Sequence, residues 1–199
     1  MKLLIINSEF PPIGGGAGGA SAFLSASLAR LGQEVTLVTS RFGSLPGREQ
    51  RQGVTILRIP ALRRRADRSG WLEQGIFALS SAWHVLGLSR RWRPDAVIAF
   101  FGVPSGPAAW LLKKVRGVPY VVSLRGGDVP GFRPYDFAVY HRLLGPFLKV
   151  IWREARAVGA NSQGLRGLAQ AFAPRQAIAV SPHGVDAAVV EIWTDVDGC

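Results

Sequence analysis

A run of glycines stands directly after the first apolar stretch of the chain, where its backbone could bind an anion. Residues 9–20 read EFPPIGGGAGGA and lie between an apolar stretch at 2–8 and an amphipathic one at 20–31. Glycine lets a backbone approach a ligand closely, and the first N–H groups of a helix carry partial positive charge. The segment therefore predicts a phosphate-binding turn formed by the backbone of Gly15, Gly16, Gly18 and Gly19. The alternative is structural, because a flexible turn or close packing of helix and strand also requires glycine.

The same segment matches a second kind of phosphate-binding turn. Gly14, Gly16 and Gly19 satisfy G-x-G-x-x-G, the spacing found in dinucleotide-binding folds. In that motif the first glycine directly follows the strand, and an acidic residue binds the ribose about 20 residues later. Here EFPPI intervenes and no such acid follows, although Arg41 would suit the 2′-phosphate of NADP. These departures disfavour an NADP-dependent oxidoreductase, and a Walker loop is excluded because Gly-Lys-Ser/Thr does not occur.

Short apolar stretches alternate along the chain with longer helical patterns, as in βαβ units with a parallel sheet. Several of these stretches, such as AVIAFF, are continuous, which is typical of strands covered by helices on both faces. The fold class is therefore α/β, a Rossmann-like domain with a mostly parallel sheet flanked by helices. Polar loops are predicted at 41–53 and 61–70. We predict strands at 2–8, 34–40, 54–60, 95–101, 119–125, 157–161 and 177–181, and helices at 20–31, 71–92, 105–116 and 137–155, with a kink at Pro146.

The composition limits the possible classes of protein. Of the 199 residues, 48% are hydrophobic and 19% are charged, which excludes a disordered chain and fits a single domain. The single cysteine, Cys199, excludes an internal disulfide framework and a cysteine-based zinc site. We expect no metal, and we interpret the D-x-D spacing of Asp195 and Asp197 as coincidence. No apolar run reaches the ~20 residues that span a bilayer, and the first is too short for a signal peptide, so we expect a cytoplasmic protein.

An excess of positive charge indicates an anionic partner. The chain carries 24 Lys and Arg against 13 Asp and Glu, a net charge of +11. Nucleic acid, an anionic membrane surface and a phosphorylated ligand all fit this charge, but no nucleic-acid-binding motif accompanies it, so we expect no nucleic acid. Trp71, Phe77, Trp83 and Trp92, flanked by arginines at 63–65 and 90–91, would let the chain rest on an anionic bilayer. The alternative is that these aromatic side chains pack into the core, because their segment lacks a clearly polar face.

Four motifs occur in an order that resembles one known family. The run PPIGGGAGGASAFLSASLARLGQEVTLVTS is similar to the N-terminal signature of the family 4 retaining glycosyltransferases, a P-P-x-x-G-G loop and a helix followed by G-x-E-V-T-V-V-T. RGGDV at 125–129 resembles the H-G-x-D-V of that family, and ANSQGL at 160–165 resembles its A-N-S-x-x-L. SPHGVD at 181–186 resembles its I-P-N-G-V-D. The resemblance covers residues 1–186.

The resemblance implies the GT-B architecture, in which two Rossmann-like domains face one another across a cleft. Residues 1–186 would form the acceptor-side domain and residues 187–199 a terminal tail, so we expect the donor-binding domain to be absent. The implied reaction transfers a sugar from a nucleotide-diphosphate sugar to a glycan or glycolipid, with retention at the anomeric carbon and without a metal or other cofactor. It would serve polysaccharide biosynthesis and would need a separate donor-binding domain or chain. The alternative is a non-catalytic module that binds an anion or a partner chain.

The resemblance also implies roles for particular residues, although it assigns no catalytic residue. The glycine turn would bind the donor diphosphate, and the acceptor side of the cleft would be lined by Arg125, Asp128, Asn161, Ser162 and His183. Arg125 stands where the family often has His, and as a permanent cation it would bind a phosphate or the acceptor rather than act as a base. Structural roles are the alternatives: a surface ion pair of Arg125 with Asp128, a turn or helix cap at Asp128 or Ser162, and a loop histidine at 183.

Overall fold

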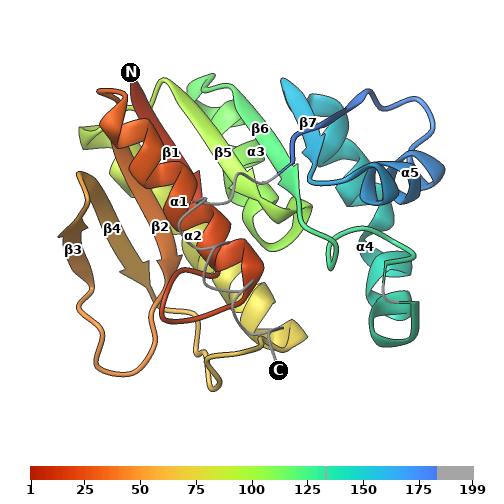
Figure 1. Cartoon of the computed structure of the whole chain (residues 1–199), viewed down its shortest axis with the longest axis horizontal. Helices are drawn as coiled ribbons and strands as arrows, with labels where there is room; N and C mark the ends of the chain where they lie inside the picture. Colours follow the sequence, from red (N-terminus) through yellow and green to blue (C-terminus); the bar gives the residue numbers. More distant parts are fainter. Residues whose placement is uncertain (133, 183–199) are drawn as a thin grey trace, which may run out of the picture.

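The computed structural model describes residues 1–132 and 134–182, with side chains described outside 134–143. Eight strands form one sheet in the order β3-β4-β2-β1-β5-β6-β7-β8 (Figure 1). All neighbouring strands are parallel except β3 and β4, which confirms the predicted α/β class with a mostly parallel sheet. The strands are β1 (Lys2–Ile6), β2 (Glu34–Ser40), β3 (Arg48–Arg51), β4 (Val54–Ile59), β5 (Ala96–Phe100), β6 (Tyr120–Leu124), β7 (Ala157–Ala160) and β8 (Ile178–Val180).

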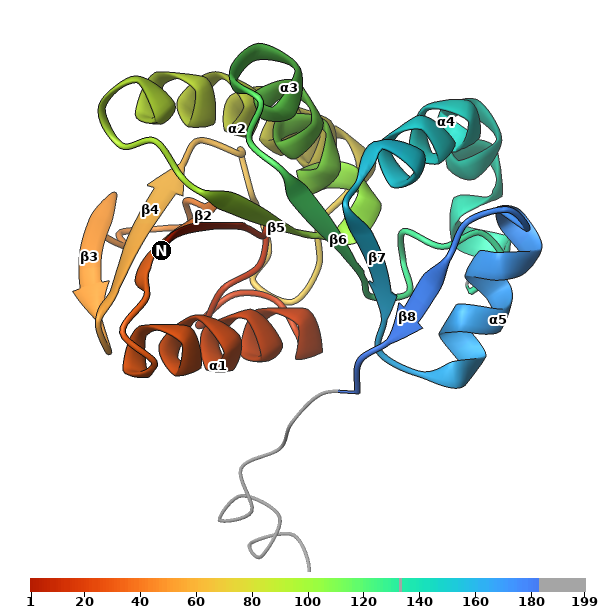
Figure 2. The same cartoon turned by 90° about the horizontal axis from the view of Figure 1, so that it is seen from above.

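Helices cover both faces of this sheet. Figure 2 shows α1 and α5 on one face and α2, α3 and α4 on the other. The helices are α1 (Gly16–Arg30), α2 (Trp71–Arg91), α3 (Gly106–Arg116), α4 (Pro134–Glu154) and α5 (Gln163–Phe172), and a short π-helical turn, η1 (Phe101–Ser105), follows β5. No helix in the described ranges has the length and apolar character needed to cross a membrane.

The central strand β1 is buried on both of its faces. Leu4 and Ile6 belong to the apolar cluster under α2, α3 and α4, whereas Ile5 belongs to a second cluster under α1. Side chains alternate between the two faces of a strand, so a strand between two helical layers must be apolar at every position. This is why the sequence has a continuous apolar run here.

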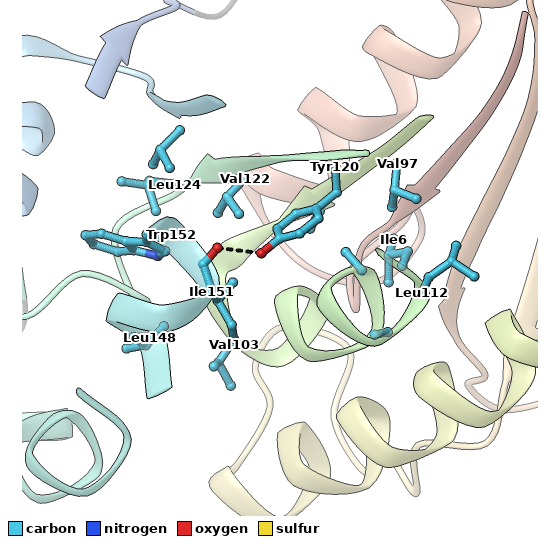
Figure 3. Packing of buried hydrophobic residues seen from close by; sticks show 14 of the residues in the cluster. Ile6, Val97, Val103, Leu112, Tyr120, Val122, Leu124, Leu148, Ile151 and Trp152 are labelled. Carbon is cyan, nitrogen blue, oxygen red and sulfur yellow. Dashed lines mark hydrogen bonds between the residues drawn. The ribbon is translucent and has the colours of Figure 1, made fainter. Parts of the chain in front are cut away.

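Helix α4 is held to the sheet through one buried tyrosine. The hydroxyl of Tyr120 on β6 donates a hydrogen bond of 2.6 Å to the carbonyl of Ile151 on α4 (Figure 3). Burial raises the pKa of this phenol, so the hydroxyl remains a donor at physiological pH. Leu148 and Trp152, which are fully buried, pack around the same contact on the α4 side. The loop that follows β6 therefore runs between two anchored elements.

Several predicted elements differ from the structure, and the largest differences concern β3, α1 and α5. Residues 41–53 were predicted to be a loop but contain β3, an exposed edge strand of sequence REQR that lacks any apolar pattern. The hairpin is set by its turn, because Gln52 and Gly53 both have positive φ, as a two-residue type I′ connection requires. Helix α1 begins at Gly16 rather than at residue 20, and α5 lies in a segment for which no helix was predicted. Helix α4 contains Pro146, as predicted, and a kink at that position stays a prediction.

Candidate functional site

A cavity lies at the carboxyl edge of the parallel strands, where the strand order reverses. The chain runs from β1 outward to β2 and β4 and then returns to place β5 on the other side of β1. Ligands of open α/β sheets bind at this kind of crevice. The cavity has a volume of about 260 Å³ and is lined by Ser8, Glu9, Asp67, Arg68, Ser69, Gln74, Phe101, Val103, Pro104, Arg125, Gly127 and Phe132.

The glycine turn, residues 14–19, lies at the same edge, at the start of α1. Gly15 is the N-cap of α1, and Gly14 before it has a φ of +88°, which favours glycine. The N–H of Gly14 donates a hydrogen bond of 2.7 Å to the carbonyl of Ala66, which ties the turn to the loop at 61–70.

The structure narrows the predicted set of anion-binding amides. The N–H groups of Gly18 and Gly19 donate to the carbonyl of Gly15 within the first turn of α1, so they do not offer hydrogen bonds to a ligand. In the described part of the chain, no acceptor lies on the N–H groups of Gly16 and Ala17, the first two residues of the helix. The first N–H groups of a helix have no partner within it. The free N–H groups of the turn are therefore those of Gly16 and Ala17, because the N–H of Gly15 donates to the carboxylate of Glu9.

The glycines of the turn differ in how much space surrounds them. A Cβ at Gly18 would lie 3.0 Å from the carbonyl oxygen of Ile13, so this glycine is needed for close packing. A Cβ at Gly15, Gly16 or Gly19 would meet nothing within 4 Å. The turn therefore presents an open surface at three of the four glycines that the sequence singled out.

Glu9 connects the glycine turn to the cavity. Its carboxylate accepts a hydrogen bond of 3.3 Å from the N–H of Gly15, and its side chain also lines the cavity. An anionic group of the chain itself thus lies at the positive end of α1. The sequence interpretation missed Glu9, although it is the one acidic residue between Met1 and Gln33.

Two buried polar side chains, Asn7 and Ser21, bind the backbone at the start of α1. The side-chain amide of Asn7 donates to the hydroxyl of Ser21 at 2.9 Å and to the carbonyl of Ala17 at 3.1 Å. The Ser21 hydroxyl donates in turn to the carbonyl of Gly18 at 2.9 Å. Because Asn7 and Ser21 are fully buried, these bonds fix where α1 begins.

Arg63 holds the loop at 61–70 against the end of β1. Its guanidinium donates hydrogen bonds to the carbonyls of Ser8, Arg65 and Ala66 at 2.9–3.2 Å, and the residue is only 8% exposed. Burial lowers the pKa of Arg63, and the nearby charge of Glu9 opposes this shift. The sequence placed Arg63 in a solvated basic cluster that would meet a membrane. This was wrong, because three backbone carbonyls draw the side chain inward.

Asp128 joins the loops that follow β5 and β6. Its carboxylate accepts hydrogen bonds from the N–H groups of Gly102, Arg125 and Gly126 at 2.6, 3.0 and 3.2 Å. The residue is 2% exposed, and burial raises its pKa while these hydrogen bonds oppose the rise. Asp128 therefore caps the turn after β6, as one of its predicted alternatives has it, and it does not cap a helix. A surface ion pair with Arg125 is wrong, because Asp128 is buried. A direct contact of Asp128 with an acceptor finds no support in this geometry.

Arg125 lies in the wall of the cavity with its guanidinium over the ring of Phe100, at 4.2 Å from the ring centroid. Stacking of this kind is a cation–π interaction, which fixes the direction of the side chain. Burial lowers the pKa of Arg125 to about 10, and the charge of Asp128 opposes the shift. The side chain therefore remains a cation near neutral pH and suits an anionic or hydroxyl-rich ligand.

The other predicted cleft residues lie away from this cavity or outside the described residues. Ser162 is the N-cap of α5, and its hydroxyl accepts a hydrogen bond of 3.2 Å from the N–H of Leu165, which confirms the capping alternative. Asn161 follows β7 and is partly buried, but neither it nor Ser162 lines the cavity. His183 and the D-x-D spacing at Asp195 and Asp197 lie outside the described residues.

These features define a class of protein: a Rossmann-like unit of GT-B type, with an open glycine turn and a polar cavity at one edge of its sheet. The chain belongs to the glycosyl transferase 4-like domain family, whose model matches residues 15–184. This match favours the glycosyltransferase prediction over the oxidoreductase alternative.

Two relatives and two solved structures are similar to this chain. The putative teichuronic acid biosynthesis glycosyltransferase TuaC of Bacillus subtilis is 28% identical over 165 residues, covering 73% of this chain and 42% of TuaC. An N-acetylglucosamine transferase of Alkalilimnicola ehrlichii, which acts on a pyrophosphoryl-undecaprenol-linked acceptor by its name, is 41% identical over 61 residues, covering 29% of this chain and 17% of that protein. The chain therefore spans less than half the length of these relatives.

The solved structures support the fold. Sucrose-phosphate synthase of Thermosynechococcus elongatus superposes with a TM-score of 0.77 at 15% identity, covering 98% of this chain and 52% of that one. The UDP-GlcNAc 2-epimerase of Neisseria meningitidis, bound to UDP-GlcNAc, superposes with a TM-score of 0.54 at 12% identity, covering 100% of this chain and 50% of that one.

Proposed function

We propose that this chain is the acceptor-side unit of a cytoplasmic, retaining and metal-independent glycosyltransferase. It would transfer a sugar from a nucleoside-diphosphate sugar to a glycan or lipid-linked acceptor. The names of the two relatives support this proposal. One is named as a putative teichuronic acid biosynthesis glycosyltransferase, and the other is named as a transferase of N-acetylglucosamine from its UDP derivative to a pyrophosphoryl-undecaprenol-linked acceptor.

One observation carries the proposal: the open start of α1 and the cavity adjoin at the switch point of the sheet, with Glu9 in contact with both. A helix N-terminus favours a phosphate group, and a neighbouring cavity favours the molecule that reacts with it. In this arrangement the donor diphosphate takes the N–H groups at the start of α1, and the acceptor occupies the cavity.

The chemistry assigned to these groups is electrostatic. During transfer the bond between the anomeric carbon and the diphosphate oxygen breaks, and its electron pair leaves with the diphosphate. The acceptor hydroxyl then forms the new bond on the same face of the sugar, and its proton is released. Fixed N–H groups at the start of α1 stabilise the charge that grows on the leaving group. Among the described residues that line the cavity, Arg125 adds a permanent cation, and Glu9 and Asp67 are the carboxylates able to accept a proton.

We further propose that transfer requires a second Rossmann-like unit that holds the nucleotide. The relatives are more than twice as long as the region they share with this chain, and the cavity alone is small for a whole nucleotide sugar. The acceptor-side unit by itself would then bind its acceptor but not turn over a donor.

The proposal is tested by joining this chain to the donor-side half of TuaC and measuring nucleotide release from a panel of nucleotide sugars. The fusion should transfer sugar in the presence of EDTA, and NMR of the product should show the anomeric configuration of the donor. The chain alone should be inactive. Turnover by the chain alone, inversion of configuration, or loss of activity in EDTA would each contradict a part of the proposal.

A further inference from the structure

Helix α2 presents an apolar stripe to the outside of the molecule. Leu72, Leu79 and Trp83 are 59%, 76% and 79% exposed, and the partly buried Ile76 lies between them, so neighbouring members are three or four residues apart. These positions share one face of a helix. Trp71 and Leu62, 68% and 69% exposed, extend the stripe beyond the start of α2. We call this set the α2 face: Leu62, Trp71, Leu72, Ile76, Leu79 and Trp83.

The core-facing side of α2 is formed by other residues, and Leu86 and Leu88 are partly buried against the core. The buried residues of the helix are Phe77, Ser81, Val85 and Ser89, so two serines point inward while tryptophan and leucine point outward. A surface helix normally buries its largest apolar side chains and exposes polar ones. The α2 face is therefore an exposed apolar patch of the kind that marks an interaction site.

Charge surrounds the α2 face but does not interrupt it. Residues 74–89 contain no Lys, Arg, Asp or Glu. Exposed arginines lie at both ends, Arg64, Arg65 and Arg68 before the helix and Arg90 and Arg91 at its end. Glu73, the acidic residue at the start of α2, is used locally, because its carboxylate accepts hydrogen bonds from the N–H groups of Arg64 and Gly70.

The exposed apolar side chains of the α2 face and the arginines at its two ends together indicate what kind of partner would bind there. Tryptophan and leucine between arginines suit the boundary between anionic headgroups and acyl chains. A second copy of the chain is disfavoured, because pairing two α2 faces would bring arginine clusters together at both ends of the contact. We propose that the α2 face docks on the surface of an anionic lipid membrane.

The α2 face begins beside the candidate acceptor cavity. Asp67, Arg68, Ser69 and Gln74 line that cavity. The other side of the same segment forms a hollow of about 310 Å³, whose wall includes Leu62, Trp71, Leu72 and Ile76. A polar cavity and an apolar hollow thus share the segment at 67–76. Resting on the proposed function, this arrangement fits an amphiphilic acceptor whose sugar enters the cavity while its lipid chain remains in the membrane.

Vesicle sedimentation tests the docking face without any need for transfer. The 199-residue chain should bind vesicles of phosphatidylcholine and phosphatidylglycerol and should bind pure phosphatidylcholine far less. The double variant Leu79→Ser with Trp83→Ser should bind the anionic vesicles about tenfold less. The matched control, Phe23→Ser with Leu31→Ser, changes two exposed apolar residues at α1, on the other face of the sheet, and should bind like the parent. Circular dichroism confirms that each variant is folded.

A second pair of variants separates docking from nonspecific attraction. Arg90→Glu with Arg91→Glu should weaken vesicle binding more than Arg48→Glu with Arg51→Glu, an equal change of charge on the exposed edge strand β3. Equal losses in these two variants, or full binding by the Leu79 and Trp83 variant, would overturn the proposal. So would a dimer in light scattering that the Leu79 and Trp83 substitutions dissociate. Absence of sugar transfer in the fusion with TuaC would instead overturn the proposed function and leave the vesicle result standing.

Discussion

The carboxylate of Asp128 accepts a hydrogen bond of 2.6 Å from the N–H of Gly102, 26 residues earlier in the chain. This bond joins the loop after β6 to the loop after β5, and both loops line the cavity. One buried carboxylate therefore links two loops of the cavity wall without lining the cavity itself. The same carboxylate also holds the backbone of Arg125, whose side chain faces the cavity.

Asp128→Ala should destabilise the fold by about 3 kcal/mol, because three N–H groups lose their acceptor in a buried position. Asp128→Asn retains one acceptor oxygen and should cost about half as much. Urea unfolding measures both. The control is Asp67→Asn, which changes an exposed carboxylate and should alter stability by less than about 0.5 kcal/mol. Equal stability of the Asp128→Ala and parent proteins would contradict the role of Asp128.

Alanine substitutions in the glycine turn should divide into two groups. Gly18→Ala should lower stability by about 1–2 kcal/mol, because its Cβ would press on the carbonyl of Ile13. Gly16→Ala meets open space in a helical position and should leave stability unchanged or raise it by about 0.5 kcal/mol. In the fusion with TuaC, however, Gly16→Ala should raise the KM for the donor. Thermal unfolding and donor kinetics are measured on both variants. A loss of stability in Gly18→Ala and a higher donor KM in Gly16→Ala would show that the first glycine serves packing and the second serves donor binding.

Glu9→Gln should improve donor binding. It removes a negative charge from the start of α1 while its amide oxygen still accepts the hydrogen bond from Gly15. A charge at a helix terminus contributes about 0.5–1 kcal/mol, so the donor KM of the fusion should fall about threefold. The control is Asp67→Asn, which removes a carboxylate of the cavity wall that pairs with Arg68 rather than with the glycine turn. This variant should leave the donor KM unchanged. An unchanged or higher KM in Glu9→Gln would show that the diphosphate does not approach Gly15.

Arg63→Met should destabilise the chain by about 2–4 kcal/mol, since three backbone carbonyls lose their donor and the loop at 61–70 loses its anchor to β1. Arg65→Met, in an exposed neighbour, should have an effect within about 0.5 kcal/mol. Chemical denaturation measures both. If the two variants lost equal stability, the buried contacts of Arg63 would not be what holds the loop.

The pair of Glu49 and Arg58 should make stability depend on acidic pH. Their closest atoms lie 3.0 Å apart, and the hydrogen bond from Arg58 lowers the pKa of Glu49 from 4.5, while burial opposes the shift. A lowered pKa in the folded state means that the carboxylate adds stability at pH above 4.5 and that this stability is lost as the pH falls through the folded pKa. Urea unfolding at several pH values should show this loss in the parent and a smaller one in Glu49→Gln. Identical profiles would contradict the prediction.

Local sequence patterns identified the features that depend on near neighbours. Continuous apolar runs predicted the buried strands, because a strand between two helical layers needs apolar side chains on both faces. Ser162 could be assigned as a cap since its partner, Leu165, is three residues away. The polar strand β3 was not predicted, because its side chains do not alternate between apolar and polar. It is a strand because its backbone pairs with that of β4.

The sequence by itself determined the α/β class, the position of the glycine turn and the family, which the match over residues 15–184 confirms. Only the tertiary structure decided which amides of that turn stay open, that Arg63 lies inward, and that Trp83 lies outward. The physical reason is distance along the chain. Hydrogen bonds such as Asp128 to Gly102 and Arg63 to Ser8 join residues 26 and 55 positions apart, and they form only after the strand order has brought those loops to one edge of the sheet.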